Sequence, residues 1–517
     1  MGNRARTRWA AVGLGLVLSL LATGCGSRTS SKELIGLLKA ADVAPAASAP
    51  QPGVPSSLPA DAGAGAATGE AAPSTPTPGA AAAGPAGAPG RSASGAVNAG
   101  APGAAAVPSQ RSSQAQGTAS AGSTKAAAGG PTAPGATPAA ATPGSCSGSE
   151  PPIIIGTVGS YSGVMGSIVA AGMRAVQAWA GRINATGGLN CHQVKYIVAD
   201  DGGDAARNQS LTRRLVEQEK VIAFVYTGAP VTAQASASYL NEKQVPEIGQ
   251  EGGHMFTYES PMTFPIGAAA IPIIRLTLAG GAKITVPKGK TKAALLTCQE
   301  VEYCNVADKV NAERASEVGY QVVYKAKVTF TQPDFTSICV SAQNAGADVL
   351  LVATDANSHQ RIMANCNRVG YRPTDVLTTI QASIDFKNDP NMDGSVIVSN
   401  VMPWFLNQNP VVAEYQATLK KYAPSQGFDA TSMNGYSSAK AFEKAVQTVP
   451  AGQPVTTKDV LAGLYRLDGD DLGGIVAPLR FTPGQPAKPV ACGWTVVLNK
   501  GEFTSDGQRF CVKGLEP

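Results

Sequence analysis

The residues whose types could support binding or catalysis begin with a glycine- and hydroxyl-rich segment at 156–163, GTVGSYSG. Such a segment between a strand and a helix can hold an anion or a hydroxyl, because backbone N–H groups point outward at a helix start. Ser160 and Ser162 could add hydroxyls to a ligand site or simply cap the helix. The glycine spacing is not that of a nucleotide loop, and Tyr161 stands where a hydrolase places its nucleophilic serine. The segment therefore favours ligand binding or capping over catalysis.

Metal and nucleic-acid chemistry have little support in the sequence. The three histidines, His192, His254 and His359, are far apart, and no zinc-type spacing occurs. The 41 Lys and Arg residues against 36 Asp and Glu residues give a net charge of +5 without a dense basic block. We therefore expect no metal, no cofactor and no nucleic-acid partner.

The elements that position these residues form an alternating series. Short β-branched runs at 153–158, 194–200 and 221–226 alternate with helical patterns, and the rhythm restarts near residue 293. Such alternation is typical of βαβ units with parallel sheets covered by helices on both faces. Because the series has two similar halves, we predict an α/β fold with two Rossmann-like lobes in residues 150–517.

Further candidates follow the predicted strands, where open α/β sheets bind ligands. In the first half these are two loops, at 226–229 and 250–254, whose glycines either admit a ligand or form plain turns. In the second half, Tyr303 either walls a cleft or packs in the core, and Asp355 either binds a ligand or caps a helix. Trp404 either stacks on a ligand or packs with Phe405. The predicted ligand-binding residues are Ser160, Tyr161, Ser162, Thr227, Gly228, Glu251 (preferred over His254, a possible surface residue), Gly252, Gly253, Tyr303, Asp355, Gln381 and Trp404.

The first 24 residues are typical of an export signal. Three arginines precede an apolar run at 10–22, which is too short to span a bilayer comfortably. The run ends in LATGC, which resembles a bacterial lipobox, so we predict a lipoprotein signal peptide at 1–24 and lipidation of Cys25. The alternative is an ordinary signal peptide with an incidental cysteine.

Residues 25–149 are predicted to be a disordered, lipid-anchored linker. Between 43 and 147 the chain is rich in Ala, Pro, Gly and Ser and contains Leu58 as its one large aliphatic residue besides valine. Such a segment cannot bury enough apolar surface to offset its ordering entropy. A glycosylated stalk remains an alternative.

The remaining eight cysteines form an even set in an exported chain, which indicates disulfides. Proximity favours Cys298 with Cys304, Cys339 with Cys366 and Cys492 with Cys511, and Cys146 with Cys191 then follows by exclusion. Eight cysteines allow about 105 connectivities, so other pairings stay open.

The order strand–GSYSG–helix–INATGG–strand–DDGGD resembles the opening of the leucine-binding-protein family, the branched-chain amino-acid type of ABC-importer receptor. Residues 473–481 resemble its late crossing strand, and the resemblance covers about 152–511. It implies a type I periplasmic-binding-protein fold with a three-stranded hinge. Lobe one would be about 152–267 plus 402–472, and lobe two about 271–400 plus 480–514, with the ligand between them.

The resemblance implies a receptor and not an enzyme. We expect a monomer, lipid-anchored on the outer face of the cell membrane, that passes a small polar organic ligand, such as an amino acid or amide, to an ABC permease. A receptor of the same fold that signals to a membrane partner is the alternative. Gln381 stands where the family's amino-acid binders place a carboxylate for the ligand ammonium, so free leucine, isoleucine and valine are not expected as main ligands.

Overall fold

The structure of the protein is a computed structural model that describes residues 150–517. The predicted signal peptide, the predicted lipidation site Cys25, the predicted linker and Cys146 lie outside the described residues. Within 150–517 the prediction of an α/β fold with two lobes and parallel sheets is confirmed. None of the helices in this part of the chain is long and apolar enough to cross a membrane.

Lobe one is built on a parallel five-stranded sheet with the order β2-β1-β3-β4-β5. Neighbouring residues of β3 point to opposite faces, since Phe224 packs with α3 and α4 whereas Val225 packs with α2 and α10. The strands are β1 (Ile153–Gly159), β2 (Val194–Asp200), β3 (Phe224–Thr227), β4 (Glu247–Gln250) and β5 (Thr263–Phe264), and the helices are α2 (Gly163–Ala185), α3 (Ala205–Glu217), α4 (Gln234–Lys243), α9 (Pro410–Tyr422), α10 (Ala430–Val446) and α11 (Thr457–Leu464).

Lobe two is built on an eight-stranded sheet with the order β12-β11-β10-β9-β8-β6-β7, to which β13 adds by pairing with β11. The strands from β7 to β10 are parallel, and β11 joins β10 in the antiparallel direction. The strands are β6 (Lys292–Cys298), β7 (Gln321–Val328), β8 (Val349–Ala353), β9 (Thr374–Thr378), β10 (Val396–Ser399), β11 (Cys492–Asn499), β12 (Glu502–Thr504) and β13 (Phe510–Cys511).

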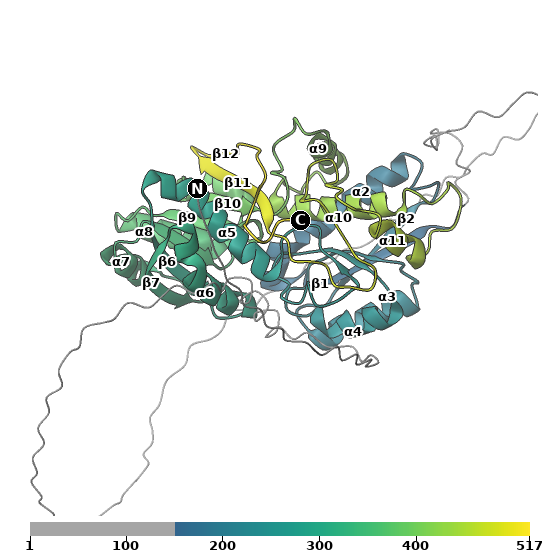
Figure 1. Cartoon of the computed structure of the whole chain (residues 1–517), viewed down its shortest axis with the longest axis horizontal. Helices are drawn as coiled ribbons and strands as arrows, with labels where there is room; N and C mark the ends of the chain where they lie inside the picture. The colour runs from purple at the N-terminus through teal and green to yellow at the C-terminus, as the bar shows by residue number, and fades with distance from the viewer. Residues whose placement is uncertain (1–149) are drawn as a thin grey trace, which may run out of the picture. The chain divides into compact units, whose positions relative to one another are not determined.

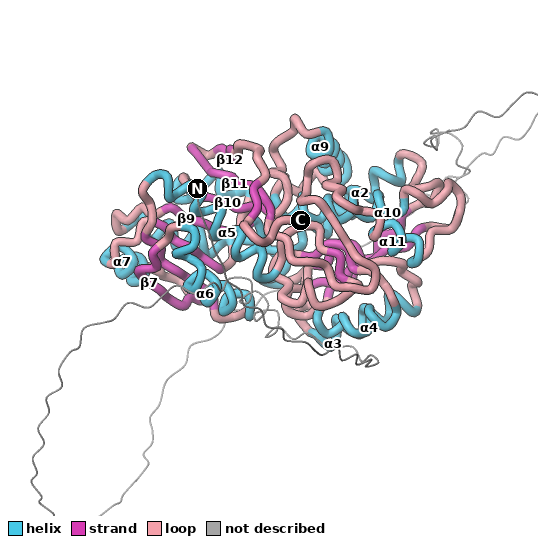
Figure 2. The backbone as a smooth tube through the Cα atoms, viewed as in Figure 1, coloured by secondary structure: helices cyan, strands magenta, loops and turns pink. Residues whose placement is uncertain are grey.

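Helices cover this second sheet on both faces. Side chains of α5 and α6 share one apolar cluster with residues of β6 and β8, and Cys339 of α7 and Ile362 of α8 belong to another. Figure 1 shows β6 to β9 with α6 to α8 gathered apart from β1, β2 and α3, and Figure 2 shows the same helices flanking the strands. The helices are α5 (Ala270–Thr285), α6 (Glu302–Arg314), α7 (Thr336–Asn344), α8 (Ala356–Arg368) and the 3-10 turns η1 (Val286–Lys288), η2 (Ala315–Val318), η3 (Thr379–Gln381), η4 (Ile384–Asn388) and η5 (Pro390–Met392).

Three segments carry the chain between the lobes, after β5, after β10 and before β11. They are tied together, because the Asn400 side-chain amide donates to the Ala268 carbonyl (3.0 Å) and the Met402 N–H donates to the Ile475 carbonyl (2.8 Å). The last crossing differs from the prediction, since residues 473–481 form turns and not a regular strand. Gly473 and Gly474 adopt positive φ values of 80° and 87°, which interrupt an extended chain.

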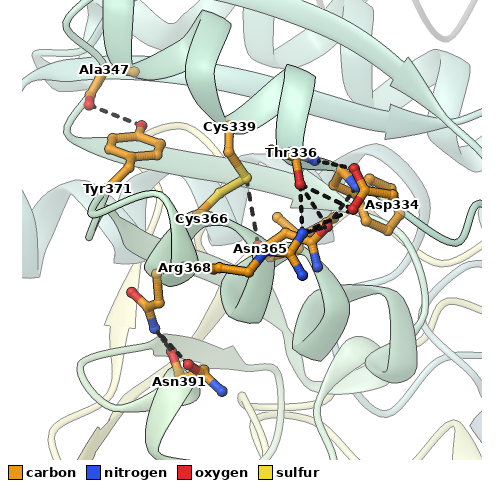
Figure 3. The surroundings of a disulfide bond; sticks show 12 residues. Asp334, Thr336, Cys339, Ala347, Asn365, Cys366, Arg368, Tyr371 and Asn391 are labelled. Atoms are coloured by element: carbon orange, nitrogen blue, oxygen red, sulfur yellow. Dashed lines mark hydrogen bonds and ion pairs between the residues drawn. A yellow bond between two sulfur atoms is a disulfide. The ribbon is translucent and has the colours of Figure 1, made fainter.

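Three predicted disulfides are present: Cys298–Cys304, Cys339–Cys366 and Cys492–Cys511. The second joins α7 to α8 beside a polar cluster, in which the Arg368 guanidinium lies 2.9 Å from the Asp334 carboxylate (Figure 3). Cys191 is also disulfide-bonded, and its partner lies outside the described residues.

Candidate functional site

A cleft of about 210 Å³ lies between the two lobes. It gathers the loops that follow β3 and β4 in lobe one and β6, β7, β8 and β9 in lobe two, together with the start of α2. This position, beyond the carboxyl ends of the strands, is where open α/β sheets bind ligands. The lining residues are Met165, Ile168, Pro230, Val231, Gln234, Glu251, Gly253, Met255, Phe256, Val301, Glu302, Tyr303, Cys304, Phe330, Thr354, Ile380 and Gln381.

Glu251 is the buried carboxylate of this cleft. Its side chain follows β4 and is only 2% exposed. One oxygen, Oε1, accepts a hydrogen bond from the Gly253 N–H at 2.8 Å, whereas Oε2 has no partner among the described residues. Burial raises the pKa of Glu251 to about 7. Glu251 therefore offers one unused acceptor to a ligand in the cleft.

Gly253, Tyr303 and Gln381 are the other predicted residues that line the cleft. Burial and the nearby charge of Glu251 raise the pKa of Tyr303, so its hydroxyl stays protonated. The Gln381 Oε1 accepts from the Thr378 N–H at 2.9 Å, which fixes this side chain at the start of η3. A Cβ atom on Gly253 would lie 3.0 Å from the Glu251 Oε2, so glycine keeps this carboxylate free of a neighbouring side chain.

The disulfide Cys298–Cys304 closes the short loop that carries three of the lining residues. It joins the end of β6 to the first turn of α6 and encloses Val301, Glu302 and Tyr303. Since Cys304 itself lines the cleft, this disulfide is part of the lobe-two wall.

The hydroxyl-rich segment at 156–163 lies outside the residues that line the cleft. The Ser160 hydroxyl donates to the Asp201 carboxylate (2.7 Å), and the Tyr161 hydroxyl shares a hydrogen bond with that of Thr157 (2.5 Å). Ser162 stands at the N-cap of α2 without a side-chain hydrogen bond to the helix backbone. Two of these three side chains therefore make hydrogen bonds within lobe one.

The first-lobe loops contribute less to the cleft than predicted. Thr227 is buried, and the Gly228 carbonyl accepts from the Ser160 N–H at 2.9 Å. The Gly252 carbonyl accepts from the Ala270 N–H at 2.9 Å, which ties this loop to the first crossing segment. None of these three residues lines the cleft.

Asp355 and Trp404 take the structural alternatives. The Asp355 carboxylate caps α8 by accepting from the Asn357 N–H at 3.0 Å and the Ser358 N–H at 3.2 Å. Trp404 packs edge-on against Phe405 and Phe503, with ring centroids 5.4 and 5.1 Å away. Neither residue lines the cleft.

His254 is not a surface residue, which corrects the sequence-based alternative. Its side chain is fully buried, and the ring nitrogen Nε2 accepts from the Ala229 N–H at 3.2 Å. Burial lowers the pKa of His254 to about 3, so the ring is neutral. A neutral ring that already accepts a backbone N–H stabilises the loop between β4 and β5.

Sequence reasoning missed the apolar walls of the cleft. Eight of the 17 lining residues are methionine, isoleucine, valine or phenylalanine, and no Lys, Arg or His is among these residues. The one available signal was position, because Pro230, Val231 and Phe330 follow predicted strands and Met255 and Phe256 extend the loop after β4.

Two α/β lobes, three crossing segments and a cleft beyond the strand ends define a bilobal ligand-binding fold. The chain belongs to the family described as periplasmic binding protein, which matches residues 152–502. Members of this family are solute-binding proteins. The predicted resemblance to type I receptors is thereby confirmed.

Individual relatives are distant. A protein of Pseudomonas aeruginosa strain PAO1 described as an amino acid binding protein is 25% identical over 199 residues, which are 38% of this chain and 52% of that relative. This match therefore spans about half of the relative's length.

Two solved structures show the same fold. A fatty acid ABC transporter substrate-binding protein from Thermomonospora curvata superposes with a TM-score of 0.59 at 16% identity, covering 70% of this chain and 93% of its own. A branched chain amino acid ABC transporter protein from Thermus thermophilus with bound valine superposes with a TM-score of 0.60 at 16% identity. The match covers 70% of this chain and 97% of that structure.

Proposed function

We propose that the chain is an extracytoplasmic receptor of an ABC importer that captures a small organic ligand between its lobes. The observation that carries the proposal is the inter-lobe cleft, where a buried carboxylate oxygen of Glu251 has no partner among the described residues. Membership of the family and the transporter descriptions of both structural neighbours support it. The lobes close about the crossings near 267, 401 and 475–480, and an ABC permease receives the ligand from the monomeric receptor.

A ligand screen tests this proposal. A ligand at a hundredfold excess over its Kd stabilises the folded state by about 2.7 kcal/mol, because it binds the folded chain and not the unfolded one. We therefore expect a broad metabolite set, measured by thermal shift on the full-length chain, to give at least one clear rise in Tm. Small-angle scattering should show a more compact particle with that ligand. A set without any stabilising compound, together with an unchanging scattering profile, would refute the proposal.

We also propose that Cys25 carries the lipid that retains the receptor at the membrane. The sequence LATGC after an apolar run supports this proposal. Replacing Cys25 by serine is expected to release the protein into the medium or leave the signal peptide uncleaved. Detergent phase separation measures the difference, since the lipidated wild type should enter the detergent phase. Recovery of the wild type in the aqueous phase would contradict lipidation.

A further inference from the structure

Among the described residues, no side chain that lines the cleft could neutralise an anionic ligand. Its lining includes two carboxylates, Glu251 and Glu302, and no Lys, Arg or His. The start of α6, where the helix dipole favours a negative charge, already carries the carboxylate of Glu302 in its first turn. A ligand carboxylate buried here would lie near the buried carboxylate of Glu251 and would have no countercharge on a lining side chain, which is costly.

The free oxygen of Glu251 points to a donor on the ligand. This oxygen, Oε2, is buried, and the other carboxylate oxygen, Oε1, already accepts a hydrogen bond from the Gly253 N–H. Among the described residues, the charge of Glu251 helps to raise the pKa values of the hydroxyls of Tyr303 on α6 and Tyr226 on β3. Since neither tyrosine can supply a positive charge, an ionised Glu251 needs a cation from the ligand.

The remaining walls suit an apolar body next to that cation. Met165 and Ile168 of α2 and Val231 line the lobe-one side, and Ile380 lines the lobe-two side. The rings of Phe256, Phe330 and Tyr303 also line the cleft, and aromatic rings attract organic cations as well as apolar groups. A cleft of about 210 Å³ holds a small molecule.

From these observations we propose that the cleft selects a small organic monocation, an amine with an apolar alkyl or aryl body and no carboxylate, whose nitrogen donates to Glu251. The inference deepens the proposed solute-binding function and rests on it. It separates this receptor from one for zwitterionic amino acids, because the carboxylate half of such a ligand finds no basic side chain in the cleft.

Two sets of probes test the proposal by calorimetry on the full-length chain at pH 8. Within each set the compounds share one apolar body and differ in charge. The aryl set is 2-phenylethylamine, 2-phenylethanol, 3-phenylpropanoate and phenylalanine, and the alkyl set is 3-methylbutylamine, 3-methylbutanol, 4-methylpentanoate and leucine. We expect the amine of at least one set to bind about tenfold or more tightly than its alcohol, acid and amino acid. An acid, alcohol or amino acid that binds as tightly as its amine would overturn the proposal.

Two variants assign the effect to one carboxylate. Glu251→Gln keeps the shape and the acceptor for the Gly253 N–H but removes the charge, so amine affinity should fall about tenfold or more while alcohol affinity changes little. Glu302→Gln is the matched control, because Glu302 lines the same cleft but is exposed, and solvent screens its charge. An equal loss in both variants, or no loss in Glu251→Gln, would contradict the role of Glu251.

The broad metabolite screen separates this inference from the function on which it rests. If neither probe set binds, the charge of the compounds that stabilise the chain in that screen decides the question. Organic cations would support the inference, whereas neutral, anionic or zwitterionic ligands would overturn it and leave the receptor function standing. A screen without any stabilising compound would refute the receptor function itself.

Discussion

Gly435→Ala in α10 is expected to lower the free energy of unfolding by about 2 kcal/mol or more, because α10 and α2 approach closely at this residue. A Cβ atom on Gly435 would lie closer than 3.0 Å to the carbonyl oxygen of Gly172, which is backbone and cannot rotate away. The backbone at Gly172 cannot move aside either, because the ring of Tyr226 occupies the position where a Cβ atom of Gly172 would lie. Inserting a methyl group into such a contact forces the two helices apart.

Gly181→Ala, in α2, is the matched control for Gly435→Ala in α10. Both changes replace a helical glycine by alanine, so both gain about 1 kcal/mol of helix propensity. At Gly181 the nearest atom to a new Cβ is a ring carbon of Tyr422 at 3.0 Å, which can shift. Urea unfolding should therefore show Gly181→Ala as neutral or stabilised and Gly435→Ala as destabilised. Equal free energies of unfolding would show that the helix contact is more tolerant than the structure indicates.

The alternation of strands and helices could be predicted because it is local. Runs such as 153–158 and 349–352 are β-branched or aliphatic and short, which is the pattern of buried parallel strands. The order of strands in each sheet is a long-range property, and so is the contact between Gly172 and Gly435. The crossing at 473–481 was predicted as a strand from resemblance, but its adjacent glycines adopt left-handed conformations and form turns.

From the sequence, the candidate site could be predicted only where its residues directly follow the ends of predicted strands. Glu251 and Tyr303 follow β4 and β6, and both reach the cleft. Ser160 and Asp355 follow β1 and β8, yet each is held by local hydrogen bonds, to Asp201 and to the start of α8. A single sequence does not distinguish a side chain that awaits a ligand from one that has an internal partner. The apolar walls were missed because apolar residues there look like core residues.

The pH dependence of stability should reveal the cost of keeping Glu251 ionised in the folded chain. Burial raises the pKa of Glu251 from 4.5 to about 7, and the same cause raises that of Glu247 to about 7. A shift of this size corresponds to about 3 kcal/mol for each group. Because the folded pKa is the higher one, this contribution to stability is present below about pH 4.5 and is lost as the pH rises through about 7.

Glu251→Gln is therefore expected to be more stable than the wild type by about 3 kcal/mol at pH 8, with the difference shrinking toward zero near pH 4.5. Urea unfolding of both proteins across this range measures it. His254, whose pKa is lowered to about 3, destabilises the fold below about pH 6.5, but it does so in both proteins and cancels from the difference. A difference independent of pH would mean that Glu251 ionises without cost.

The variant Glu247→Gln tests whether removing a buried carboxylate stabilises the fold without also weakening amine binding. Glu247 is buried like Glu251, has a similarly raised pKa, and does not line the cleft. Both variants should therefore gain stability at pH 8, but only Glu251→Gln should lose affinity for an amine, measured by calorimetry at the same pH. Such a divergence would identify Glu251 as a carboxylate that destabilises the empty receptor and is compensated when a ligand cation binds. Loss of affinity in both variants would instead indicate that the charge of the whole β4 region, and not this one side chain, favours the cation.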